Sequence, residues 1–124
     1  MRAMTDSRDV ARIALASIRL FNGLAALVAP RMLAGRLGID ADANPAALYV
    51  LRMFGVRTVL IGIDLFVQHG ERRAEALRHA VLIHASDTLA AFLASRSAAF
   101  PRPMARIIVV ISAVNTALAI YASR

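Results

Sequence analysis

The chain has no cysteine, no lysine and no tryptophan, and its aromatic residues are two tyrosines and five phenylalanines. The absence of cysteine excludes disulfides, thiol catalysis and thiolate metal sites. The sequence also has no HExxH segment, no glycine-rich phosphate-binding loop and no serine with a convincing catalytic partner. We therefore expect a protein that is not an enzyme and that holds neither a metal nor a cofactor.

All 15 basic residues are arginines, and the formal net charge is +7. These arginines are spread from Arg2 to Arg124 and are not interleaved with aromatic residues along one polar stripe, as a nucleic-acid-binding surface would require. We therefore expect no nucleic acid partner. A basic chain with long apolar segments is better explained by loops that lie against anionic lipid headgroups.

Four apolar stretches fill most of the 124 residues, and 59% of the residues are hydrophobic. Each stretch has about the 20 residues that a helix needs to cross a bilayer. The sequence predicts an all-α fold, a four-transmembrane-helix bundle with up-down-up-down order that forms one integral membrane domain over residues 1–124. The expected spans are about 10–29, 46–67, 76–94 and 104–122.

The connections differ in character. Residues 31–44 mix apolar and charged side chains, which predicts a short interfacial helix closed by Gly38. Asn44 precedes a proline and is the predicted N-cap of the second span. Residues 68–75 predict a charged turn, and residues 95–103 predict the loop before the fourth span. The arginines of the tails and of that turn slightly outnumber those of the other two loops, which predicts that both termini are cytoplasmic.

Charged residues inside the second span oppose its insertion. Arg52, Arg57 and Asp64 would each cost roughly 2.5–3.5 kcal/mol at the centre of a membrane helix. Arg52 and Asp64 lie nearer the ends and can reach the interface, so Arg57 is the residue that needs an opposite charge inside the protein. Asp87, near the middle of the third span, is the predicted partner.

The other spans carry polar residues at a similar depth. If the helices alternate in direction, Arg19, Arg57, Asp87 and Asn115 fall at nearly one level, which predicts a buried polar layer. Gly55 and Gly62 share a different face of the second span and predict close approach to a neighbouring helix. The candidate polar-layer or binding residues are Arg19, Asn22, Arg52, Arg57, Asp64, His84, Asp87 and Asn115.

This layer has three interpretations. In the first, Arg57 and Asp87 form a structural ion pair that fixes which helices pack together. In the second, the same residues bind an anionic ligand or line a path for protons or ions. In the third, the charges face another protein. His84 and Asp87 supply at most two metal ligands from one helix, so we expect no metal there.

One set of motifs resembles a family. The order Pro30-x-x-Leu33-Ala34, Leu37-Gly38, Leu51-Arg52-x-x-Gly55-x-Arg57 with Gly62, and then Asp87, is similar to that of small four-helix bacterial membrane proteins that are broadly DoxX-like. The resemblance covers the first three spans. It implies a four-helix membrane fold in which Arg52, Arg57 and Asp87 are marked residues, and it implies no particular activity.

Together these features predict a non-enzymatic accessory or scaffold subunit in the bacterial plasma (inner) membrane, crossing it several times. Its expected partners are the lipid bilayer and either further copies of itself or another membrane protein. The alternatives are a small oligomeric transporter or channel, or a binder of an anionic lipid or small anion. An enzyme acting on lipid or quinone substrates and a soluble helical protein also remain open.

Overall fold

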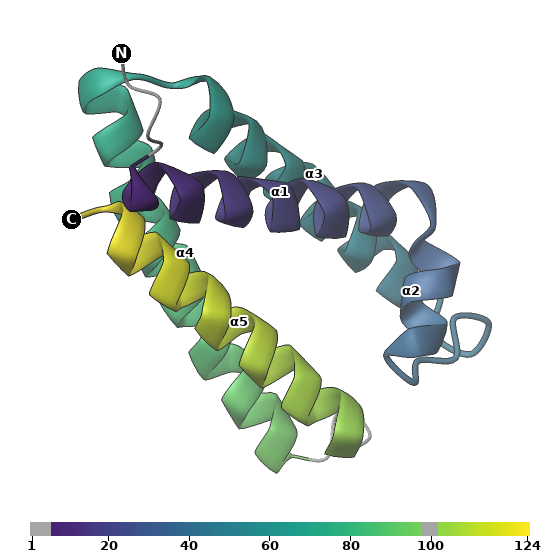
Figure 1. Ribbon diagram of the computed structural model, residues 1–124. Coiled ribbons are helices and arrows are strands. Elements are labelled where there is room, and N and C mark those ends of the chain that lie inside the picture. The colour runs from purple at the N-terminus through teal and green to yellow at the C-terminus, as the bar shows by residue number, and fades with distance from the viewer. Residues whose placement is uncertain (1–5, 98–101) are drawn as a thin grey trace.

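The computed structural model describes residues 6–97 and 102–124, and within these residues it contains five α-helices and no strand (Figure 1). The all-α prediction is confirmed. The helices are α1 (Ser7–Val28), α2 (Pro30–Arg36), α3 (Ala46–Val67), α4 (Gly70–Arg96) and α5 (Arg102–Ala122).

The four long helices form two antiparallel hairpins. Helix α1 packs along α3, and α4 packs along α5, whereas α3 and α4 touch only over a short stretch. Figure 1 shows the hairpins diverging from one corner, where α1 begins, α5 ends and α3 connects to α4. The up-down-up-down order is present. The hairpins splay apart, however, so the four helices do not form a closed bundle with aligned axes.

Helix α3 coincides with the predicted second span, and α1 begins three residues before the predicted start. The predicted charged turn over 68–75 is wrong, because α4 already begins at Gly70. Glutamate and arginine are good helix formers, and Glu71 in the first turn interacts favourably with the helix dipole. A charged stretch therefore continues the helix, and the turn is only two residues long. The predicted loop over 95–103 overlaps residues 98–101, which lie outside the described residues.

The predicted short helix after the first span is present as α2, which begins at Pro30, and Gly38 follows it with a positive φ of 76°. The Ile39 amide donates back to the Ala34 carbonyl at 2.9 Å, which is a common way for a helix to end at glycine. The prediction for Asn44 is wrong. Pro45 is the N-cap of α3, without a side-chain cap, and Asn44 contributes only its carbonyl, which accepts from the Ala47 amide at 3.1 Å.

The hydrophobic core lies at the corner and consists largely of alanine. Small side chains let the four long helices approach closely there. The buried cluster comprises Ala11, Leu15, Ala16, Leu65, Leu77, Ala80, Ala119 and Ala122.

Along the first hairpin, glycines replace alanines at the contact. Gly23 of α1 and Gly55 and Gly62 of α3 are buried, and at each of them an added β-carbon would come within 3.0 Å of the other helix. The glycine face of the second span therefore packs closely on α1, as its spacing predicts. This tight hairpin fixes the positions of the polar side chains on α1 and α3.

Among the described helices, α1 and α5 are long and apolar enough to cross a membrane. Two of the four predicted spans are therefore candidate membrane spans by length and composition.

Candidate functional site: a polar layer between the hairpins

Arg57 of α3 and Asp87 of α4 form an ion pair across the space between the two hairpins. Arg57 Nη2 lies 3.6 Å from Asp87 Oδ1, so the predicted partners are brought together. The pair is not enclosed, because 47% of the Arg57 side chain and 29% of the Asp87 side chain are exposed. The prediction that Arg57 is buried in the interior is therefore wrong. Arg57 is open because α3 and α4 diverge soon after the corner.

The enclosed cation is Arg19 of α1, which is only 3% exposed. Its Nη2 donates to Thr58 Oγ1 at 3.2 Å, and its guanidinium lies 5.7 Å from the centre of the Phe54 ring. The Arg57 guanidinium lies 5.8 Å from the same ring. Two cations thus gather around one aromatic side chain, where each gains a cation–π contact.

His84 of α4 and Asn115 of α5 complete the layer and are fully buried. Neither ring nitrogen of His84 has a hydrogen-bond partner within the described residues, and the same holds for Asn115 Oδ1 and Arg19 Nε. His84 lies within electrostatic range of both Arg19 and Arg57. Buried polar atoms are nearly always paired in proteins, so four unpaired ones in a single layer need an explanation.

Asn22 of α1 is half-buried and lies beside Asn115 in a groove of about 450 Å³ between α1 and α5. The rest of the wall is mostly apolar, with Ile18, Phe21, Val110 and Val114 among its residues. Asn22, Asn115 and Ser17 are the polar residues of this mostly apolar groove, on the side of the layer formed by α1 and α5.

Two predicted site residues lie apart from the layer. Arg52 is exposed on α3. Asp64 is also exposed, near the corner, where its Oδ1 accepts from Gln68 Nε2 at 3.4 Å. Both therefore occupy positions nearer the helix ends, as their place in the span suggests.

We define the polar layer as Arg19, Thr58, Arg57, Asp87, His84 and Asn115. Sequence reasoning missed Thr58 and the Phe54 ring. Thr58 lies three residues after Gly55 and so falls on the face that packs against α1, while Phe54 lies three residues before Arg57. Those spacings were the available signals, but an isolated threonine or phenylalanine in an apolar helix does not by itself indicate a functional site.

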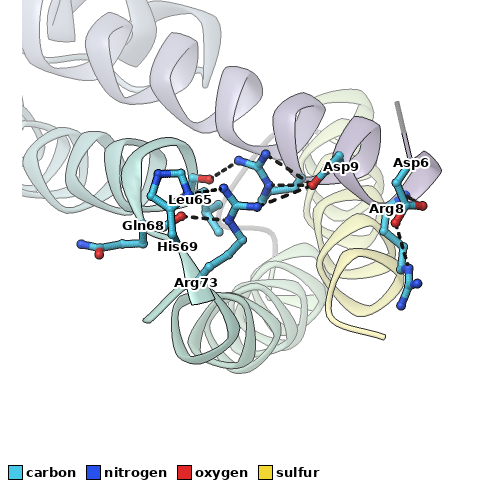
Figure 2. A network of polar contacts seen from close by, with 8 residues as sticks. Asp6, Arg8, Asp9, Leu65, Gln68, His69 and Arg73 are labelled. Atoms are coloured by element: carbon cyan, nitrogen blue, oxygen red, sulfur yellow. Dashed lines mark hydrogen bonds and ion pairs between the residues drawn. The ribbon is translucent and has the colours of Figure 1, made fainter. Parts of the chain in front are cut away.

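A second polar cluster, at the corner, was also missed (Figure 2). Arg12 of α1 is 8% exposed and donates from Nη1 to the Leu65 carbonyl at 2.6 Å, near the end of α3. Its Nε lies 3.4 Å from Asp9 Oδ1, and Arg73 Nη1 of α4 lies 3.7 Å from the same carboxylate oxygen. Asp9 therefore links α1 to α4.

Further contacts extend this cluster to the connection and to α5. Arg73 donates from Nε to the Gln68 carbonyl at 2.8 Å and approaches His69 Nδ1 at 3.1 Å (Figure 2). The Ser7 hydroxyl lies 2.6 Å from the Tyr121 hydroxyl of α5. We call the group of Asp9, Arg12, Arg73 and the Leu65 and Gln68 carbonyls the polar corner; its link between α1 and α4 is the ion pair of Asp9 with Arg73.

The polar layer contains two guanidinium groups and one carboxylate. Guanidinium groups pair with carboxylates or bind other anions. Within residues 6–97 and 102–124, no cluster of three or more histidine, aspartate or glutamate side chains is placed to hold a metal ion.

Comparisons of the chain with protein-family models, with curated proteins and with solved structures find no match.

Proposed function

We propose that the protein is a four-span integral membrane protein that serves as an accessory or scaffold subunit of a membrane assembly. The observation that carries this proposal is the distribution of polarity. Large apolar side chains point outward from the four long helices, while arginine, histidine, asparagine and threonine side chains are buried between them. Hydrocarbon around the helices favours this distribution, whereas water opposes it.

Helix α3 supports four spans although it carries three charges. Most of its exposed residues are large and apolar, beside the exposed Arg52, Arg57 and Asp64. They are Tyr49, Val50, Met53, Val56, Leu60, Ile63, Phe66 and Val67. From the middle of α4 onward, Leu82, Leu89, Phe92 and Leu93 are exposed in the same way. Exposed apolar surface on this scale is rare on soluble monomers and marks contact with a membrane or a partner.

The outermost helix of the second hairpin gives further support. Within the apolar window of α5, only 17% of the residues are buried. The core helix of a soluble protein would be enclosed on most sides, and α5 is not. Lipid would cover an apolar helix of this length that the rest of the protein leaves open.

The diverging hairpins support the scaffold role. The polar corner and the alanine core hold the hairpins together at one end, and the walls beyond it expose apolar side chains such as Val56, Leu60 and Leu89. A helix of another membrane protein, or of a second copy, would bury these walls. The bacterial plasma membrane, cytoplasmic termini and the resemblance to DoxX-like proteins belong to the same proposal.

A small transporter or channel is a second candidate, favoured by the two arginines that gather near one carboxylate in the layer. In that case the layer would line a polar path in an oligomer. The scaffold role is preferred because Arg19, His84 and Asn115 are enclosed by their own helices, while only Arg57 and Asp87 are open.

Membrane fractionation followed by gentle extraction tests the proposal. The protein should stay with membranes after an alkaline carbonate wash and should leave a mild-detergent column with a partner or as an oligomer. Release by carbonate would overturn the membrane assignment. Retention in the membrane, combined with a lone monomer after extraction, would overturn only the scaffold role.

A further inference from the structure

The charges of the polar layer do not balance. Arg19 and Arg57 are both cations, and the one carboxylate in the layer belongs to Asp87. Asp87 lies within electrostatic range of Arg19 but is in contact with Arg57. The remaining members, Thr58, Asn115 and His84, add no negative charge. The layer therefore carries at least one surplus positive charge.

Apart from the cation–π contacts with Phe54, little stabilises that surplus charge. Arg19 is 3% exposed, and its one hydrogen bond within the described residues goes to the neutral hydroxyl of Thr58. Its Nε is buried and unpaired. An isolated charge away from water is strongly destabilising, and buried cations are found paired with anions. The protein's own residues pair only one of these two guanidiniums.

Unused hydrogen-bonding capacity is concentrated at the same place. Besides Arg19 Nε, both His84 nitrogens and Asn115 Oδ1 lack partners among the residues described. The Arg57–Asp87 contact of 3.6 Å is longer than a hydrogen bond, so Arg57 also keeps donors available. Arg57 and Asp87 are part-exposed, which gives a ligand a way in from the side formed by α3 and α4.

We propose that the polar layer binds a monoanion of the carboxylate type, held by the guanidinium groups of Arg19 and Arg57 beside Phe54. Guanidinium groups match the planar geometry of a carboxylate and form strong charge-assisted hydrogen bonds with it. The bound anion neutralises the surplus charge and takes up the donors that the protein leaves unpaired.

A small carboxylate and the head of a fatty acid share this chemistry. Because Arg57 and Asp87 are part-exposed, the aliphatic chain of a fatty acid would extend from the layer toward lipid on the side formed by α3 and α4. The proposal goes beyond the scaffold role and rests on the membrane placement. The first experiment is therefore co-flotation of the protein with lipid vesicles on a density gradient.

The test uses the full chain in nanodiscs of phosphatidylcholine, which brings no net charge. Acetate, laurate and dodecanol are titrated by calorimetry, and thermal unfolding is followed in parallel. Binding of laurate, with or without acetate, supports the proposal, and acetate binding alone also supports it. Dodecanol binding as tightly as laurate would overturn it, because the anionic charge would then contribute nothing, and binding of none of the probes would overturn it as well.

Variants identify the site. Arg57→Gln should weaken binding at least about tenfold, because it removes the surplus charge and charge-assisted bonds. Arg52→Gln removes an exposed arginine from the same helix and should bind as the original chain does. Asp87→Asn increases the surplus charge and should bind more tightly. If Arg57→Gln does not fold, Asp87→Asn decides: weaker binding than in the original chain overturns the proposal.

Discussion

Gly23 of α1 and Gly55 of α3 face each other with no room for a side chain between them. A β-carbon on Gly55 would lie 2.8 Å from the Gly23 carbonyl oxygen, and one on Gly23 would lie 3.0 Å from the Gly55 carbonyl oxygen. The neighbouring atoms are backbone, so they cannot move aside without separating the helices. Gly55→Ala should therefore destabilise the protein by about 1–3 kcal/mol, measured as a lower free energy of unfolding in detergent.

Gly35 provides the matched control. It lies within α2, and an added β-carbon there would meet nothing within 4 Å. Gly35→Ala should be neutral or stabilise by up to about 1 kcal/mol, because alanine favours the helix. Equal destabilisation by both substitutions would show that the α1–α3 contact is not close.

The ion pair between α3 and α4 predicts rescue by charge exchange. Arg57→Glu places two carboxylates together and Asp87→Arg places two guanidiniums together, so each should lower stability. The double variant restores opposite charges and should recover part of the loss, with a coupling of about 0.5–3 kcal/mol in a thermodynamic cycle.

The control for this exchange replaces the exposed Arg52 with glutamate in the Asp87→Arg background. It changes net charge by the same amount without a carboxylate at position 57. Rescue by this control would mean that net charge, and not the pair, sets the stability.

Arg12 predicts a cost at the polar corner. Replacing it with methionine removes the bond to the Leu65 carbonyl and leaves Asp9 paired only with Arg73. The free energy of unfolding should fall by about 1–3 kcal/mol, because a buried acceptor loses its donor. Arg78→Met, at an exposed position of α4, should change stability by no more than about 0.5 kcal/mol. Similar losses at both positions would argue against a specific role of the corner.

The chain has no native cysteine, which makes its orientation simple to measure. Cysteines at Gln68 and Ser123 should react with an impermeant maleimide from one side of the membrane, and a cysteine at Ala43 from the other. This follows because α3 returns to the corner where α5 also ends, while residue 43 lies beyond α2. Labelling of all three positions from one side of sealed vesicles would contradict the four-span arrangement.

Much of the helical fold could be predicted from the sequence, because apolar length and the spacing of glycines act locally. The bounds of α3, the glycine face and the pairing of Arg57 with Asp87 follow from such patterns. The early start of α4 could not be predicted in this way, because the same charged residues are found both in loops and at helix ends.

The degree of burial in the site could not be predicted either. Whether Arg19 or Arg57 is enclosed depends on how far the hairpins diverge, which no local pattern encodes. The polar corner was missed for a related reason: Arg12 donates to a backbone carbonyl 53 residues later, and carbonyls have no sequence signature. A contact of that kind becomes visible only when the helices are assembled.

The hairpin arrangement has a consequence for assembly during translation. Helices α1 and α3 are complete as a pair before α4 is synthesised, and Arg12 can then already bond to the Leu65 carbonyl. Arg73 follows only six residues after the end of α3, so its contact with Asp9 can form while the rest of α4 is still in the ribosome. Asn115 is the last member of the polar layer to be made, and it reaches the layer only when α5 folds back. The N-terminal hairpin would thus act as the template onto which the later helices are added.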